Sequence, residues 1–141
     1  MAEGLHLRQG REIAPVPTKE EYNSIRSEEV QALAEETDCD ILVATPTTLL
    51  LDIDSHADLS FFRKQYERLK DHFPFKGYVT LKSRSGNWHV IVTLRCEMAL
   101  RERIMLQAVM GSDRVRDALS LVRDLLGDEK PVLLLRPRSQ S

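Results

Sequence analysis

The chain has 141 residues and a formal net charge of −2, with 42% hydrophobic and 30% charged residues. This length suits one domain with its own core, and the composition excludes collagen-like and disulfide-rich chains. The apolar runs are far shorter than the roughly 20 residues that cross a bilayer, and because the first ten residues contain no apolar stretch we expect no secretory signal. We therefore expect a cytoplasmic protein without a membrane partner, with Cys39 and Cys96 as reduced thiols.

Charge is divided unevenly along the chain. Residues 1–60 carry four Lys or Arg and 13 Asp or Glu, whereas residues 61–141 carry 16 basic and nine acidic residues. Such asymmetry fits a basic face for a polyanion, with carboxylates gathered elsewhere. It also fits helices that carry solvated Arg and Lys side chains, and both interpretations stay open.

The first elements follow from turn residues and apolar spacing. Residues 1–17 are polar and end in Pro-Val-Pro, which predicts an arm without regular structure. A Thr-Lys-Glu-Glu capping box at residue 18 predicts a helix over 19–37. Short strands are expected at 41–45 and 49–54, and the three leucines in the second indicate burial on both of its faces.

The middle of the chain predicts a helix and a hairpin. Apolar residues at alternating steps of three and four form one stripe over 59–73, and Pro74 ends this helix. Two β-rich runs, 77–82 and 88–94, flank a polar loop of five residues that contains a glycine. This pattern is typical of a β-hairpin.

Two helices and a strand complete the domain. A helix over 97–110 stops at Gly111, the next helix begins after a Ser-Asp cap, and a last strand is expected at 131–136. The apolar stripe of the second of these helices consists of Val115, Leu119, Val122 and Leu126. The order α-β-β-α-β-β-α-α-β predicts an α+β fold over 18–136, with one sheet, helices mainly on one face, and a flexible tail at 137–141.

One candidate site lies at the end of the second strand, which reads Leu-Leu-Leu-Asp-Ile-Asp. Alternate residues of a strand share a face, so Asp52 and Asp54 point the same way. Carboxylates this close repel each other unless a cation lies between them, and their hard oxygens suit Mg²⁺ or Mn²⁺. The alternative is that both aspartates are solvated turn residues.

A second candidate site is the hairpin loop and the strand that follows it. Hydroxyl side chains, a glycine and basic residues together make a cradle for a triphosphate. The residues selected for nucleotide contact are Lys82, Ser83, Arg84, Ser85, Gly86 and His89. The alternative is a surface hairpin with a half-buried histidine. Trp88 precedes His89 and therefore points to the opposite face, where we expect it to pack in the core.

The two sites together resemble a known family. The strand ending in Asp52-Ile53-Asp54, followed by a helix and then by Ser85-Gly86-x-x-His89 before Val-Ile-Val, is similar to the archaeo-eukaryotic primase superfamily, in its compact phage and plasmid form. The match covers residues 41–94, with a continuation through 136. The resemblance implies an RRM-like, mostly antiparallel sheet with helices mainly on one face.

The resemblance also implies an activity. Asp52 and Asp54 would hold Mg²⁺ or Mn²⁺, and Ser85 and His89 would contact the phosphates of an incoming nucleoside triphosphate. The reaction would be metal-dependent nucleotidyl transfer in DNA replication, on a single-stranded DNA template and alongside other replication proteins. The family adds a third acidic residue on a later strand, and the last strand here has none. Asp113 is the substitute, with a helix N-cap as its other interpretation, and Asp40 is a weaker candidate.

Two other functions remain open. The chain could be a non-catalytic RRM-like module that binds nucleic acid or protein, or a metal-dependent nuclease that uses the same aspartates. The nucleotidyltransferase hypothesis predicts that Asp52, Asp54 and His89 converge in one open cleft, and a His89 packed in the core would weaken it. Several arginines of the second half are either a template path or solvated helix faces. They are Arg101, Arg103, Arg114, Arg116 and Arg123.

Overall fold

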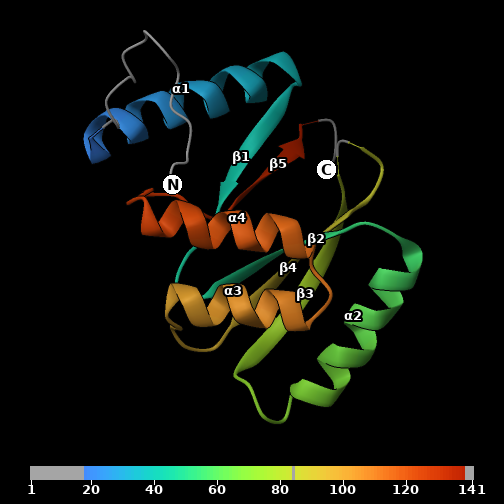
Figure 1. Ribbon diagram of the computed structural model, residues 1–141. Helices are drawn as coiled ribbons and strands as arrows, with labels where there is room; N and C mark the ends of the chain where they lie inside the picture. Colours follow the sequence, from blue (N-terminus) through green and yellow to red (C-terminus); the bar gives the residue numbers. More distant parts are fainter. Residues whose placement is uncertain (1–17, 84, 139–141) are drawn as a thin grey trace, which may run out of the picture.

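The structure, a computed structural model, describes residues 18–83 and 85–138. Over these residues the chain forms four helices and five strands in the expected order, which confirms the α+β class (Figure 1). The elements are α1 (Lys19–Glu36), β1 (Cys39–Val43), β2 (Thr48–Ile53), α2 (His56–Leu69), β3 (Phe75–Lys82), β4 (Trp88–Leu94), α3 (Leu100–Val109), α4 (Arg114–Leu125) and β5 (Leu133–Pro137). None of the described helices has the length and apolar content needed to cross a membrane. The arm expected at 1–17 lies outside the described residues.

The larger sheet contains β2, β4 and β3 in that order, with antiparallel neighbours. β2 and β3 therefore run in the same direction on either side of β4, and α2 connects them as a crossover helix. β3 and β4 form the expected hairpin. In the register of β2 and β4, Asp52 lies opposite His89. Because facing side chains of such a pair have Cβ atoms about 5 Å apart, this register brings the two polar residues together.

One face of the larger sheet packs against α2 and forms the main core. Leu51 and Ile53 of β2, Val90 and Val92 of β4, and Phe62 of α2 all lie in this cluster and are fully buried. Full burial of one such side chain contributes about 1.5–3 kcal/mol. The alternation that buries these residues turns the residues between them, Asp52 among them, to the other face.

Trp88 lies on the α2 face and packs against the main core, as the sequence predicts. Lys82 faces it across the hairpin and places its ammonium nitrogen 3.9 Å from the centre of the indole ring. A cation over an aromatic face is attracted by the ring quadrupole. Lys82 therefore lies on the side of the sheet opposite to His89.

The outer edge of β2 is closed by α3 and by the turn that leads to α4. Alternate residues of an edge strand direct their backbone N–H and C=O groups outward, and four hydrogen bonds satisfy these groups here. We call them the edge bonds: Leu50 N to Gln107 Oε1 (3.1 Å), Arg116 Nη1 to Leu50 O (2.9 Å), Asp52 N to Ser112 Oγ (3.1 Å) and Asp113 N to Asp52 O (2.9 Å).

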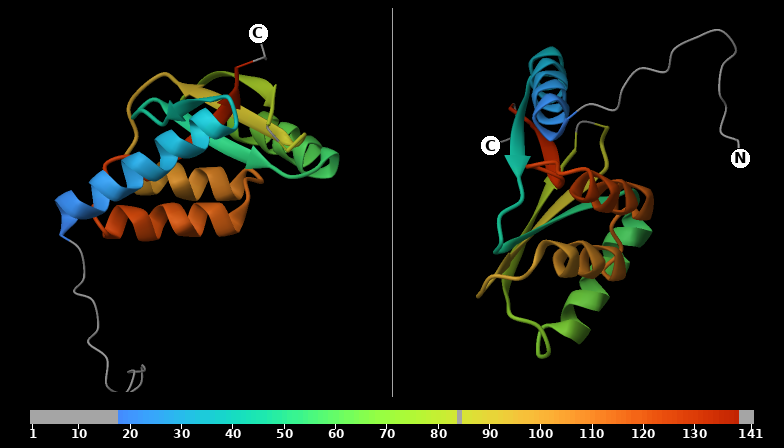
Figure 2. Two further views of the ribbon diagram at one scale, coloured as in Figure 1. Left: turned by 90° about the horizontal axis from the view of Figure 1, so that it is seen from above. Right: turned by 60° about the vertical axis from the view of Figure 1, so that its left-hand side comes forward.

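The edge bonds explain a difference from the expected fold. The sequence predicts one sheet, whereas the described strands form two, because β5 cannot pair with a β2 edge that is already occupied. β5 pairs instead with β1 in antiparallel register, with Ile41 opposite Leu135. Figure 2 shows α1 lying beside β1.

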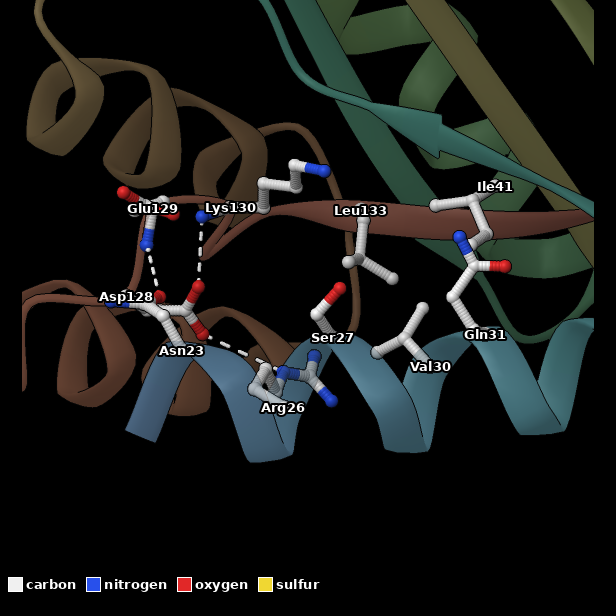
Figure 3. Close-up of a pocket in the computed structure, with 10 residues that line it drawn as sticks. All are labelled: Asn23, Arg26, Ser27, Val30, Gln31, Ile41, Asp128, Glu129, Lys130 and Leu133. Carbon is white, nitrogen blue, oxygen red and sulfur yellow. Dashed lines mark hydrogen bonds and ion pairs between the residues drawn. The ribbon is translucent and has the colours of Figure 1, made fainter. Parts of the chain in front are cut away.

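Helix α1 begins with the expected capping box and is held by few apolar contacts. It buries Val30 and Ala34. Its other anchor is the buried carboxylate of Asp128, which accepts a hydrogen bond from the Tyr22 hydroxyl (3.0 Å) and lies 3.5 Å from the Nε of Arg26. Figure 3 shows Asp128 facing Arg26 in a pocket of about 80 Å³ between α1 and the segment that leads into β5. The polar residues of this pocket therefore serve to attach α1 to the rest of the domain.

The end of the chain differs from the flexible tail expected at 137–141. Pro137 belongs to β5, and Arg138 forms ion pairs with Asp38 (3.2 Å) and Asp40 (3.0 Å). These contacts hold Asp40 at the start of β1, so it does not join the candidate site described below. Residues 139–141 lie outside the described residues.

Candidate metal and nucleotide site

Three carboxylates meet at the end of β2. Asp52 is half-buried and lies on the face of β2 opposite to the main core, as the strand alternation predicts. Asp54 is exposed, follows the end of β2 and lines a hollow with Asp58 of α2. Asp113, from the turn between α3 and α4, joins them. One carboxylate oxygen from each of the three residues lies within 4.8 Å of the others.

The edge bonds place Asp113 in this cluster. The Ser112 hydroxyl and the Asp113 N–H both bind the backbone of Asp52, so the turn is fixed against the strand. The turn begins at Gly111, whose φ of +100° is a conformation that favours glycine. Asp113 also caps α4, because its Oδ1 accepts hydrogen bonds from the backbone N–H groups of Val115 (2.9 Å) and Arg116 (3.4 Å). Asp113 is therefore a helix N-cap, and it also lies in the carboxylate cluster.

The electrostatics of the cluster favour a bound cation. Burial raises the pKa of Asp52, and the charge of Asp113 raises it further, while Arg116 opposes both effects. Burial also raises the pKa of Asp54, with further contributions from Asp113 and Asp52. A divalent cation would stabilise the ionised form of all three groups, and carboxylate oxygens are the ligands that Mg²⁺ and Mn²⁺ prefer. The donor set therefore fits such an ion.

His89 lies next to the cluster, with its Nε2 3.8 Å from Asp52 Oδ1. The ring is buried, and burial together with the nearby charge of Arg116 lowers the pKa of His89 to about 4. At neutral pH the imidazole is therefore uncharged, with one nitrogen as donor and the other as acceptor. Its Nδ1 has no hydrogen-bond partner within the part of the chain that the structure describes. A buried ring nitrogen without a partner is one that a ligand could satisfy.

A pocket of about 240 Å³ opens over this histidine, so His89 faces a cleft rather than a closed core. Its polar lining comes from β2, β4, the β3–β4 loop and α4, and β5 closes its other side. The polar residues are Asp52, Ser83, Ser85, His89 and Arg116. Asp54 and Asp113 line a neighbouring hollow of about 440 Å³ with Arg114. The carboxylates thus stand between two cavities.

The hairpin loop supplies the two serines. Ser83 N donates to Asn87 O (2.7 Å), and Gly86, with a φ of +88°, completes the turn. The Oγ atoms of Ser83 and Ser85 are 3.0 Å apart at the rim of the pocket. Gly86 shapes the loop without lining the pocket, and Lys82 points to the Trp88 side. Arg84, the remaining residue selected from the sequence, lies outside the described residues.

Arg116 is the functional candidate that the sequence analysis placed elsewhere. Its guanidinium is largely buried, donates to Leu50 O (2.9 Å) and Leu133 O (3.4 Å), and pairs with Asp117 (3.5 Å). A template path would need an exposed side chain. One signal in the sequence could have placed Arg116 near the site. It follows the Asp113 cap by three residues, so both residues lie on the first turn of α4. Arg103 is also buried and donates to Met98 O.

In comparisons with known proteins, no family model matches the chain, and neither a curated protein nor a solved structure matches it significantly.

Proposed function

We propose that the chain is a metal-dependent nucleotidyltransferase of primase–polymerase type that acts in DNA replication. One observation carries the proposal: a third carboxylate, Asp113, completes the pair formed by Asp52 and Asp54, beside a pocket lined by His89 and two serines. This arrangement brings the three candidate carboxylates close to three of the six residues that the sequence selected for nucleotide contact, Ser83, Ser85 and His89. The proposal also rests on the motif resemblance to the primase superfamily.

The protein's own groups would act by positioning and by charge. Asp52, Asp54 and Asp113 would hold the metal ions. The hydroxyls of the β3–β4 loop and the uncharged ring of His89 would donate hydrogen bonds to phosphate oxygens of a nucleoside triphosphate. Bound Mg²⁺ or Mn²⁺ would supply positive charge for the attack of a 3′-hydroxyl on the α-phosphate, with pyrophosphate as the leaving group.

The edge bonds give this site its rigidity. Two of them fix the backbone of Asp52 against the turn that carries Asp113, so the backbones of these two residues stay adjacent as long as β2 and the turn remain paired. Their mutual repulsion is therefore retained in the fold and would be relieved by cation binding. Retained strain of this kind is common where a site is preorganised for a ligand.

The test is incorporation of labelled nucleotides on single-stranded DNA with Mn²⁺, by the wild type and by Asp52→Asn. Asn keeps the shape of the side chain and removes its charge, and we expect a loss on the order of 100-fold or more. Asp71→Asn is the matched control, because Asp71 is exposed and follows the far end of α2. The control should retain full activity.

The other hypotheses predict different results in the same assay. Cleavage of DNA without added nucleotides, lost in Asp52→Asn, would identify a nuclease. Binding of DNA without incorporation or cleavage, unchanged in Asp52→Asn, would identify a non-catalytic module. Either result contradicts the proposal.

A further inference from the structure

The outward face of α4 is apolar. The stripe formed by Val115, Leu119, Val122 and Leu126 is exposed, with exposed fractions of 70%, 47%, 50% and 53%. The buried residues of α4 are instead Asp117 and Ser120. A surface helix ordinarily directs its apolar stripe to the core, whereas α4 directs its apolar stripe to solvent and buries polar residues.

Polar contacts fix α4 in this rotation. Asp117 accepts a hydrogen bond from Gln107 Nε2 (3.2 Å) and pairs with Arg116, whose guanidinium binds the backbone of β2 and β5. Turning the apolar stripe inward would bury it against these groups and break the edge bond from Arg116. The stripe therefore remains available to another surface.

Exposed apolar residues also lie on α3, the helix that packs beside α4. Figure 1 shows α3 packed alongside α4, and the two helices are tied by the ion pair between Arg101 and Asp124 (3.2 Å). Met105 and Val109 of α3 and Leu125 of α4 are also exposed, at 64%, 52% and 72%. With the stripe they present roughly 700 Å² of surface, against the roughly 800 Å² that each partner buries in a standard interface. Patches larger than a few hundred Å² mark interaction sites.

We propose that a second copy of this chain covers the patch, with the two α4 helices antiparallel about a two-fold axis. The steps along the stripe are four, three and four residues, and this series is the same in both directions. A two-fold axis between residues 120 and 121 therefore sets Leu119 against Val122 of the second copy, and Val115 against Leu126 of the second copy. An isologous interface requires this self-complementarity.

The chemistry of the patch supports a second copy over a nucleic acid. The seven side chains are uncharged, so two such faces do not repel each other, and they offer no cation to a phosphate backbone. Steps of three and four residues suit helix packing at a shallow crossing angle. Antiparallel packing also sets the two helix dipoles in opposite directions.

The first test is the mass of the full chain in solution, measured by sedimentation over a range of concentrations. We expect a dimer at micromolar concentrations, and we expect Leu119→Glu to raise the dissociation constant on the order of 100-fold. Val79→Glu is the matched control, because Val79 is an exposed apolar residue on β3. It should leave the dimer intact, and circular dichroism confirms the fold of both variants.

A cross-link tests the geometry even where Leu119→Glu disturbs the fold. In a Cys96→Ser background, a mixture of chains carrying Leu119→Cys and chains carrying Val122→Cys should form a disulfide-linked dimer far more readily than either alone, because the axis pairs residue 119 with residue 122. A monomeric wild type at about 100 µM, a Leu119→Glu variant as dimeric as the wild type, or equal cross-linking in all samples would overturn the proposal.

Discussion

Replacing Gln107 with methionine tests whether the edge bonds hold β2 in place. Gln107 is fully buried; its Oε1 accepts from Leu50 N (3.1 Å), and its Nε2 donates to Asp117 Oδ1 (3.2 Å). Methionine has a similar length and volume but can make neither bond. The variant therefore keeps the packing and removes two hydrogen bonds.

The expected loss follows from the groups left behind. The Leu50 N–H is left without a partner in the interior, which costs about 1–3 kcal/mol. The Asp117 carboxylate loses its hydrogen bond from Gln107 but keeps Arg116, so this second loss costs about 1–2 kcal/mol. Asp117 Oδ1 keeps its ion pair with Arg116 (3.5 Å), whereas Asp117 Oδ2 accepts no hydrogen bond from the described residues. We expect the free energy of unfolding to fall by about 2–5 kcal/mol and the melting temperature by about 6–15 °C.

Urea unfolding of the wild type, Gln107→Met and Gln65→Met measures this loss. Gln65 lies on α2 and donates one solvent-accessible hydrogen bond to Val109 O (3.1 Å), so its substitution should change stability by less than about 0.5 kcal/mol. If Gln107→Met were as stable as Gln65→Met, the edge of β2 would not depend on Gln107, and our explanation of the two sheets would be wrong.

Two further predictions concern His89 and Gly111. In buffer with a chelator, the contribution of His89 to the free energy of unfolding should fall by up to about 3 kcal/mol between pH 6.5 and 4, because the unfolded chain binds a proton at His89 that the fold excludes. His89→Gln lacks this contribution, so the difference in stability between the wild type and the variant should change by that amount over this range. The two proteins are compared at each pH because Asp117, whose pKa burial raises to about 6, titrates there with the opposite sign; parallel curves would refute the burial of a neutral His89. Gly111→Ala should have a melting temperature well below that of the wild type, because φ at residue 111 is +100° and the added Cβ would lie 2.9 Å from a ring carbon of Phe61. Gly77→Ala is the control, because a Cβ at residue 77 meets nothing within 4 Å. Equal melting temperatures of the two variants would contradict this account of the turn.

Local patterns in the sequence were enough to place the strands of the larger sheet and the residues of the site. The two-residue period of β2 put Asp52 and Asp54 on one face, and the glycine loop predicted the hairpin that carries His89. The same alternation put Trp88 in the core. These predictions depend only on residues that are close together in the chain, so they could be made from the sequence.

Contacts between distant segments were not accessible in the same way. Periodicity identified the apolar stripe of α4, but the side it faces is set by Gln107 and Asp117, whose pairing brings two helices together. The site role of Asp113 likewise depends on a hydrogen bond to Asp52, 61 positions earlier in the chain. No local sequence pattern shows whether a helix N-cap aspartate also lies beside other carboxylates.

Calorimetric titration of Mn²⁺ into the wild type, Asp54→Asn and Asp71→Asn tests the central claim most directly. Asp54 is the exposed member of the cluster, so its substitution leaves the edge bonds intact and removes one repelling charge. We predict saturable Mn²⁺ binding by the wild type and by Asp71→Asn. In Asp54→Asn we predict that the Mn²⁺ affinity is lower by about 10-fold or more, and that the melting temperature without metal is at or above that of the wild type. Equal Mn²⁺ affinity in all three proteins, or no saturable binding by the folded wild type, would contradict a metal site at the end of β2.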